Sequence, residues 1–326
     1  MSRRCAVVDL TCARHDNPDH PESHARLLNA IGGIPEGIPR ITPDAASVDD
    51  VCRIHDRHYV SWLKERCADT TRLSHLDGDT YVTPHSFDAA LMAAGGAIAA
   101  ADHALAGEHA FAFIRPPGHH AERARAMGFC LLNNAAIAAH KALDHVDRVA
   151  IVDWDIHHGN GTQHAFYLSN RVLYCSVHQE YIFPSTGAIG EIGNGTGKGL
   201  TINAPLMAGC GIGDYQAVFA EVFVPAIERF KPGLVMVSAG QDILFDDPLG
   251  GMNLFPPDLS ILTTLLAQAT ETPLALVLEG GYGQSHGESV SCIYSALDRG
   301  AEIPVPSPRD HTRRVVDLLR KVHRLA

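Results

Sequence analysis

Short apolar segments alternate with longer amphipathic ones along most of this chain. The runs at 5–10, 110–114, 148–152, 172–177, 233–238 and 273–278 are nearly continuous in apolar residues, as in strands buried on both faces of a parallel sheet. Between them the pattern predicts helices at 48–65, 86–105, 161–168, 212–230, 257–269, 286–297 and 312–322, with two more ending near Ala30 and Leu143. This alternation predicts an α/β protein in which helices flank a central, mainly parallel sheet, and residues 1–326 are expected to form a single domain.

Polar side chains that carry chemistry cluster just after these predicted strands. They follow the carboxyl ends of five separate apolar runs, and in open α/β sheets ligands bind at that edge. The residues concerned are His119, His120, Asp153, Asp155, His157, Ser176, His178, Asp242 and Tyr282. We therefore expect one functional site at the carboxyl edge of the sheet.

Asp153, Asp155 and His157 follow one another at intervals of two residues. If the strand at 148–152 continues through them, these three side chains share one face. Two carboxylates and an imidazole at the end of a buried strand need a compensating cation, and Zn²⁺ or a neighbouring divalent metal suits these donors. The alternative is a salt-bridged strand end whose histidine is satisfied by backbone.

Composition narrows the class of protein. The chain is 46% apolar and 19% charged, which is typical of a globular protein, and its net charge of −11 argues against direct nucleic-acid binding. That charge fits a cationic substrate or partner only weakly, and a solvated surface that serves solubility is the favoured explanation. Eight cysteines without a CxxC pair indicate reduced thiols in a cytoplasmic protein, and neither a signal peptide nor a membrane span is expected.

A set of motifs resembles the zinc-dependent histone deacetylase family, which also includes acetylpolyamine amidohydrolases and acetoin-utilisation-type proteins. These motifs are Arg-Pro-Pro-Gly-His-His at 115–120, Gly-Phe-Cys-Leu-Leu-Asn-Asn at 128–134, Asp-Trp-Asp-Ile-His-His-Gly-Asn-Gly at 153–161, Ser-Ala-Gly-Gln-Asp at 238–242, Asp-Pro-Leu-Gly-Gly at 247–251 and Glu-Gly-Gly-Tyr at 279–282. They occur in the family's order from about residue 15 to residue 282. The resemblance implies the arginase/deacetylase fold, and Asn160 resembles the class II side of the family.

The resemblance also implies a metal site and the catalytic groups around it. Asp155, His157 and Asp242 match the metal ligands, and Fe²⁺ or Co²⁺ would suit this oxygen-rich set as well as Zn²⁺. The catalytic groups would be His120 as general base and then acid, His119 as its companion, Asp153 and Asn160 as their respective partners, and Tyr282 as the donor to the developing oxyanion.

Substrate and monovalent-cation positions follow from the same resemblance. Phe129 and Phe183 would line a narrow tunnel around the substrate's aliphatic arm, Gly128 beside them would also contact the substrate, and Asp79 would grip the substrate backbone. Structural K⁺ ions would be held, largely by main-chain carbonyls, at two groups of positions: Asp153, Asp155, His157, Ser176 and Val177, and Phe166, Ser169 and Val172.

The implied activity is hydrolysis of the acyl amide of N-acyl-lysine or a related N-acyl amine by metal-activated water. An acetylpolyamine amidohydrolase and a low-turnover acyl-lysine-binding scaffold remain as alternatives. Leu249 stands where one polyamine-selective relative has a glutamate, which weakens the polyamine reading. The expected partner is the acylated substrate, and a homo-oligomer is left open.

Overall fold

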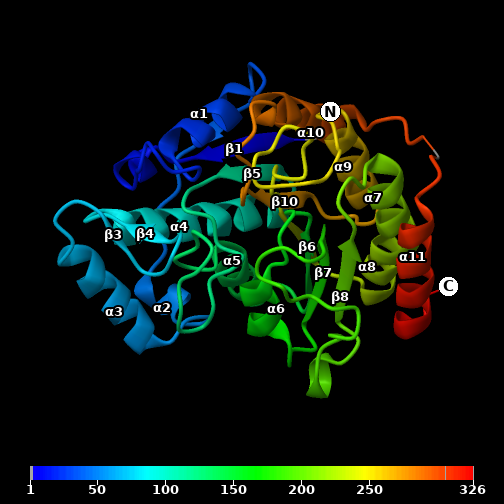
Figure 1. Cartoon of the computed structure of the whole chain (residues 1–326), viewed down its shortest axis with the longest axis horizontal. Coiled ribbons are helices and arrows are strands. Elements are labelled where there is room, and N and C mark those ends of the chain that lie inside the picture. The colour runs from blue at the N-terminus through cyan, green and yellow to red at the C-terminus, as the bar shows by residue number, and fades with distance from the viewer. Residues whose placement is uncertain (1–2, 305, 326) are drawn as a thin grey trace.

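An eight-stranded parallel sheet forms the centre of the molecule (Figure 1). The computed structural model describes residues 3–304 and 306–325. The strand order is β2-β1-β5-β10-β9-β6-β7-β8, and every neighbouring pair is parallel. The strands are β1 (Arg4–Val8), β2 (Arg40–Ile41), β5 (His109–Phe113), β6 (Val149–Asp153), β7 (Val172–Gln179), β8 (Thr201–Leu206), β9 (Leu234–Ser238) and β10 (Leu274–Val277). The predicted α/β class with a central parallel sheet is confirmed.

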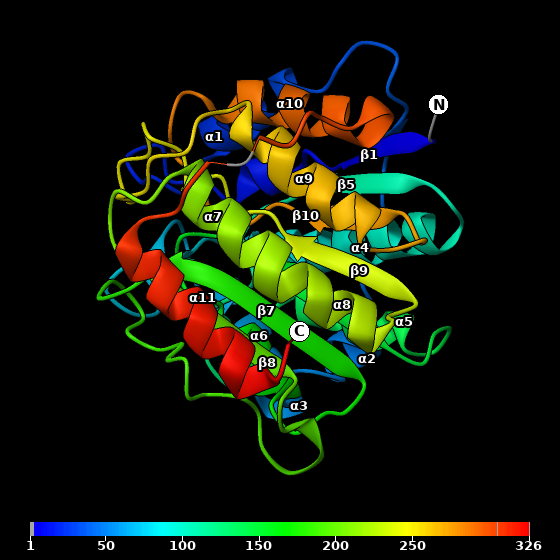
Figure 2. The same ribbon diagram turned by 90° about the vertical axis from the view of Figure 1, so that its right-hand side faces the viewer.

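Helices cover both faces of this sheet. One face packs against α4 (Ser86–Leu105) and α5 (Asn134–Ala142), whose alanines and glycines allow the helices to lie close to the strands. The other face packs against α1 (His24–Gly32), α7 (Ile212–Val218), the π-helical turn η3 (Phe219–Phe223), α8 (Val224–Phe230), α9 (Asp258–Gln268), α10 (His286–Arg299) and α11 (Asp310–His323). Figure 2 shows α7, α8, α9 and α11 in front of the strands. Each buried strand therefore has apolar residues on both sides.

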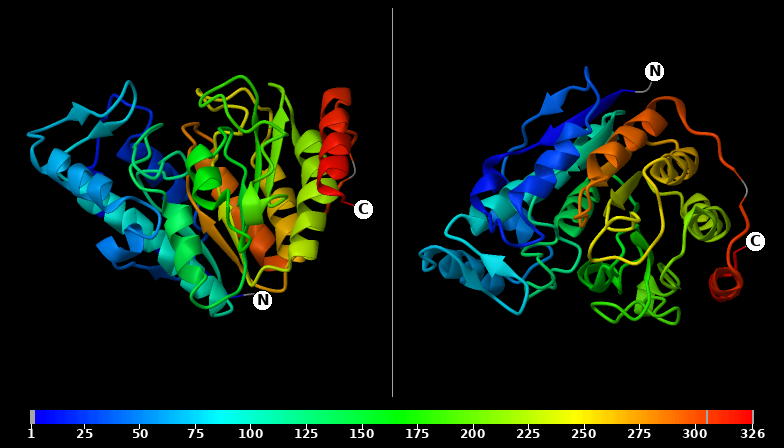
Figure 3. Two further views of the ribbon diagram at one scale, coloured as in Figure 1. Left: turned by 90° about the horizontal axis from the view of Figure 1, so that it is seen from below. Right: turned by 45° about the horizontal axis from the view of Figure 1, so that its top comes forward.

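Short elements complete the described part of the chain, and some of them also contribute to the core. They are η1 (Thr11–Arg14), α2 (Val48–Val51), α3 (Arg57–Ala68), the antiparallel pair β3 (Ser74–His75) and β4 (Tyr81–Val82), α6 (Asn160–Phe166) and η2 (Gly195–Gly197). Figure 3 shows α3 and α11 at opposite sides of the molecule. Along the described residues, no helix combines the length and the apolar character that crossing a membrane requires.

The structure corrects two predicted elements. The helix expected over 48–65 is broken into α2 and α3, because His55 turns into the interior and bonds the backbone of Glu122 and Asn133. The region 200–206, for which the pattern predicts no strand, forms the edge strand β8, where Thr201, Asn203 and Pro205 interrupt the apolar pattern.

Candidate functional site

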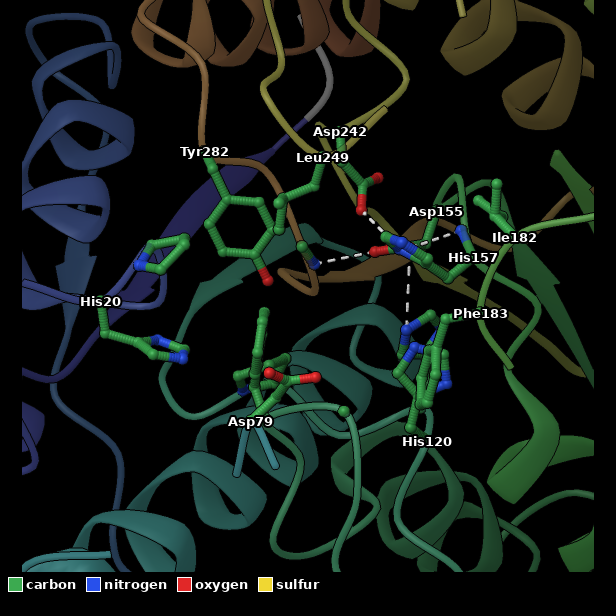
Figure 4. Close-up of a pocket in the computed structure, with 16 residues that line it drawn as sticks. His20, Asp79, His120, Asp155, His157, Ile182, Phe183, Asp242, Leu249 and Tyr282 are labelled. Atoms are coloured by element: carbon green, nitrogen blue, oxygen red, sulfur yellow. Dashed lines mark hydrogen bonds and ion pairs between the residues drawn. The ribbon is translucent and has the colours of Figure 1, made fainter. Parts of the chain in front are cut away.

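A cavity of about 440 Å³ opens at the carboxyl edge of the sheet. Figure 4 shows side chains from several loops pointing into it. Its lining is formed by His20, Pro21, Asp79, Pro117, His119, His120, Gly128, Phe129, Asp155, His157, Ile182, Phe183, Asp242, Leu249, Gly280 and Tyr282. The cavity therefore lies at the edge of the sheet where the sequence predicts a functional site.

Asp155, His157 and Asp242 meet at the floor of this cavity. Their potential ligand atoms all lie within 4.8 Å of one another, and His157 Nδ1 is 3.2 Å from both Asp155 Oδ1 and Asp242 Oδ2. The geometry differs from the expected one: β6 ends at Asp153, so Asp155 and His157 lie in the following loop and do not share a strand face. Asp242 holds that loop, because its Oδ1 accepts a hydrogen bond from the Ile156 N–H at 2.9 Å.

These three groups strongly influence one another's protonation. Burial and the negative charge of Asp155 raise the pKa of Asp242 to about 8. Burial disfavours the charged form of His157, but its contacts with the two carboxylates raise its pKa to about 10. Within the described residues no lysine or arginine forms an ion pair with either carboxylate. Buried carboxylates without such a partner, beside an imidazole, form a donor set that fits a divalent cation.

His119 and His120 face the cavity from the turn after β5, with ring centroids 3.9 Å apart. His119 Nδ1 lies 3.1 Å from Asp153 Oδ2, whereas His120 Nδ1 lies 2.8 Å from Asn160 Oδ1. Burial alone would lower the pKa of both imidazoles. For His119 the carboxylates of Asp155 and Asp153 outweigh burial and raise the pKa to about 10, but the pKa of His120 stays well below its ordinary value. The predicted pairing of each histidine with its partner is present, and the two rings have different proton affinities.

Glu279 anchors the turn that carries the two histidines, a function that the sequence alone does not predict. Its Oε2 accepts hydrogen bonds from the backbone N–H groups of Gly118 at 2.7 Å and His119 at 3.1 Å. The side chain is fully buried, and burial raises its pKa to about 7 although nearby His119 opposes the shift. Its position directly after a buried strand was the available signal.

Tyr282 directs its hydroxyl into the cavity from the loop after β10 (Figure 4). Its backbone N–H donates to Asp247 Oδ2 at 2.6 Å, and the Arg26 guanidinium lies 4.9 Å from the centre of its ring. Burial raises the pKa of the Tyr282 phenol well above its ordinary value, so the hydroxyl keeps its proton at neutral pH.

The four predicted substrate-contacting residues all line this cavity: Gly128, Phe129, Phe183 and Asp79. The Phe183 ring lies edge-on to His120 at 4.9 Å, and the Phe129 ring lies edge-on to Tyr282 at 5.9 Å. Gly128 fits between these groups because a Cβ at its position would lie only 2.6 Å from His120 Cδ2 and 2.8 Å from Phe183 Cε1. The two phenylalanines therefore form an apolar entrance to the polar floor.

Two residues that are not among the predicted site residues, His20 and Leu249, also line the cavity. His20 lies edge-on to Phe129 at 4.7 Å, and its polar loop gave only a weak signal. Leu249 is 38% exposed at the cavity and contributes an apolar side chain.

The predicted monovalent-cation residues fall in two places. Asp153 and Ser176 are paired in register between β6 and β7, with Val177 next along β7 and Asp155 and His157 in the adjoining loop. Phe166 and Ser169 line a separate cavity of about 360 Å³ at the end of α6, and Val172 begins β7. Binding of K⁺ at these positions remains a prediction.

Comparison with known proteins matches the histone deacetylase domain to residues 17–297. The chain is 40% identical to a probable deacetylase of Archaeoglobus fulgidus over 280 residues (82% of this chain, 77% of that protein) and 38% identical to a histone deacetylase-like amidohydrolase of Pseudomonas aeruginosa over 280 residues (82% and 73%). It is also 38% identical to histone deacetylase 18 of Arabidopsis thaliana (97% of this chain), of which it spans only 51%. The crystal structure of the HDA15 HD domain superposes with a TM-score of 0.92 at 31% identity, covering 99% of this chain and 94% of that one.

Proposed function

Since this chain belongs to the histone deacetylase family, we propose that it is a metal-dependent amidohydrolase that cleaves the acyl amide of N-acyl-lysine or a related N-acyl amine. Membership of this family supports a deacetylase-type hydrolase. The identity of the substrate and the dependence on a metal are what we propose. The observation that carries the proposal is that the buried donor set, the two histidines and the Tyr282 hydroxyl all face one cavity.

Asp155, His157 and Asp242 would hold the cation, with Zn²⁺ first and Fe²⁺ or Co²⁺ as alternatives. When bound, such an ion polarises the amide carbonyl and makes water a stronger nucleophile at neutral pH. The protein would supply these ligands and would position the groups that move protons.

His120 is proposed to take the proton of the attacking water and later to give it to the leaving amine. Its Nδ1 faces Asn160 Oδ1, an acceptor, so Nδ1 carries the hydrogen and Nε2 of the neutral ring holds the free lone pair. His119, whose Nδ1 lies 3.1 Å from Asp153 Oδ2, would be the charged or hydrogen-bonded companion of His120.

Tyr282 is proposed to donate a hydrogen bond to the amide oxygen as negative charge develops on it. Its buried hydroxyl remains protonated, and a donor fixed in advance costs no reorganisation during the reaction. The aliphatic arm of the substrate would pass between Phe129 and Phe183, with its polar end near Asp79 at the rim.

Acetate release from a fluorogenic acetyl-lysine peptide, with Zn²⁺ supplied, tests the proposal. Tyr282→Phe is expected to lower kcat by about 10²–10³, and His120→Ala is expected to lower it further without unfolding the protein. Tyr181→Phe is the matched control, because it removes a hydroxyl from a residue that is 91% exposed and does not line this cavity. Equal inactivity of all four proteins towards several acyl groups, with acyl-lysine still bound, would identify a scaffold.

Comparing kcat/KM for acetyl-lysine peptides with kcat/KM for acetylated polyamines distinguishes an acyl-lysine deacetylase from an acetylpolyamine amidohydrolase. Leu249 supports the lysine reading, because an apolar side chain at the cavity offers a polyamine ammonium no charged partner. We also propose a cytoplasmic location, which rests only on the cysteine pattern of the sequence, eight scattered cysteines without a CxxC pair.

A further inference from the structure

A chain of polar contacts connects His120 to the protein surface. His120 Nδ1 lies 2.8 Å from Asn160 Oδ1, and Asn160 Nδ2 donates to Glu122 Oε1 at 2.5 Å. The Glu122 carboxylate then meets His164 Nδ1, which is 2.8 Å from Oε1 and 3.0 Å from Oε2. Asn160 is buried, the Glu122 side chain is 20% exposed, and His164 is 52% exposed.

The surroundings of Asn160 fix which way its carboxamide points. An amide group has an oxygen that accepts and a nitrogen that donates, so its two ends are not equivalent. The nitrogen end faces acceptors only: Glu122 Oε1, the His120 carbonyl oxygen at 3.4 Å and Met127 Sδ at 3.5 Å. A reversed amide would bring its oxygen against the Glu122 carboxylate, with no hydrogen between two acceptors.

We propose that Glu122 is a positioning residue that sets the orientation of the Asn160 amide and, through it, the tautomer of His120. With Asn160 Oδ1 turned towards the ring, His120 must carry its hydrogen on Nδ1, and Nε2 is left free to accept a proton. The inference rests on the proposed function in that His120 is the proton acceptor.

The neighbouring dyad shows why an asparagine needs this help. Asp153 faces His119 Nδ1 with a carboxylate, both of whose oxygens are acceptors, so no third group has to orient it. Asn160 can present either an acceptor or a donor to His120. Glu122 removes that ambiguity.

A purely structural function for the Glu122 side chain is less well supported. The backbone of Glu122 already anchors its loop, because its N–H donates to Arg125 at 2.9 Å and its carbonyl oxygen lies 2.9 Å from His55 Nδ1. Both contacts survive replacement of the side chain. The ion pair with half-exposed His164 is of the kind that contributes little to stability.

The first test compares Glu122→Leu in two backgrounds, using deacetylation of an acetyl-lysine peptide by the zinc-loaded protein. With Asn160 present, Glu122→Leu is expected to lower kcat by about tenfold to a hundredfold with little change in KM. In the Asn160→Asp background, Glu122→Leu should leave kcat unchanged or raise it. The carboxylate at position 160 can accept a hydrogen bond from His120 with either oxygen, so Glu122 is not needed to orient it. The substitution also removes the negative charge of Glu122 from beside that carboxylate. An equal loss in both backgrounds would show a structural function and overturn the proposal.

Glu108→Leu is the matched control. Glu108 also pairs with a histidine, at 2.8 Å from His103 Nδ1, but it lies outside the cavity lining. It should leave kcat unchanged, and a loss as large as that of Glu122→Leu would count against a specific function of Glu122.

A second measurement does not depend on turnover. ¹⁵N NMR of labelled histidines, with the His120 signals identified by their loss in His120→Ala, reports which ring nitrogen carries the hydrogen. The parent should show Nδ1–H only, and Glu122→Leu should show a mixture of tautomers. An unchanged tautomer in Glu122→Leu refutes the proposal even if the parent hydrolyses nothing, whereas a parent without turnover refutes only the proposed function.

Discussion

Replacing Glu22 by glutamine should strongly destabilise the fold. Glu22 and Arg115 are both fully buried, and their side chains form a two-point ion pair with Oε1–Nε and Oε2–Nη2 distances of 2.7 Å. Arg26 Nη1 adds a third contact to Oε1 at 3.2 Å. The pair joins the loop before α1 to the end of β5, directly before the turn that carries the two cavity histidines.

Two physical routes give a similar magnitude. Burial alone would raise the pKa of Glu22, but the charge and hydrogen bonds of Arg115 lower it from an ordinary 4.5 to about 2. That difference of about 2.5 pH units corresponds to about 3 kcal/mol at ~1.36 kcal/mol per unit. Removing one partner of a buried ion pair generally costs about 3–5 kcal/mol, because the other charge is left uncompensated.

The pH dependence has a definite sign. Because the pKa of Glu22 is lower in the folded than in the unfolded state, its contribution is fully present above about pH 4.5 and is lost as the pH falls towards 2. In that window the stability of the parent should fall by up to ~1.4 kcal/mol per pH unit from this group alone. The glutamine variant cannot show this term.

Urea unfolding of parent and Glu22→Gln between pH 7 and pH 3.5 measures both effects, with Glu65→Gln on the exposed surface of α3 as the matched control. The difference between parent and Glu22→Gln should be about 3 kcal/mol or more at pH 7 and should shrink below pH 4.5. Two outcomes would refute the predicted contribution of Glu22. One is a difference in the free energy of unfolding under about 1 kcal/mol at pH 7, which is the range of a surface ion pair. The other is a difference that stays constant as the pH falls.

Three further predictions concern the cavity. Dialysis against a strong chelator should abolish hydrolysis, and Zn²⁺, Fe²⁺ or Co²⁺ should restore it; full activity of metal-free protein contradicts the metal site. Gly280→Ala should lower the metal bound per chain in elemental analysis, because its Cβ would lie 2.7 Å from Asp155 Oδ2 and closer still to an Asp242 oxygen; unchanged metal content contradicts this. Gly128→Ala should lower kcat/KM with an unchanged circular dichroism spectrum, because φ is +55° there and its Cβ would clash with the cavity wall; parent-like kinetics contradict this.

The sequence predicts the interior of this fold better than its edges. β5, β6, β9 and β10 are buried on both faces, so their apolar runs are nearly continuous and easy to recognise. The edge strand β8 contains Thr201, Asn203 and Pro205 and lacks that pattern. Its pairing with β7 comes from tertiary contacts that a local window does not contain.

His55 shows that a helix boundary, too, can depend on contacts that a local sequence window does not contain. Residues 48–65 have a helical pattern on both sides of His55, but this side chain is 2% exposed and bonds the backbone of two distant loops. The chain breaks there and α3 starts at Arg57. The partners of His55 stand at positions 122 and 133, far away in the sequence, so a local window does not contain these contacts.

The predicted metal ligands, the two adjacent histidines and Tyr282 come together at one cavity, but for a reason different from spacing along one strand. His178, which was expected at the same site, lines a separate cavity. Asp155 and His157 lie in a loop, and backbone N–H groups at 155 and 157 donate to the carboxylates at 153 and 155, which coils the loop around its own acids. What completes the group is the sheet order β5-β10-β9-β6, because it makes these four strands neighbours and brings the loops after them together. The two adjacent histidines follow β5, Tyr282 follows β10, Asp242 follows β9, and Asp155 and His157 follow β6. A parallel sheet with the strands in their order along the chain would place β7 and β8 between β6 and β9 and separate Asp242 from Asp155. The residue types alone identify which side chains carry the chemistry, and the strand order determines that they meet.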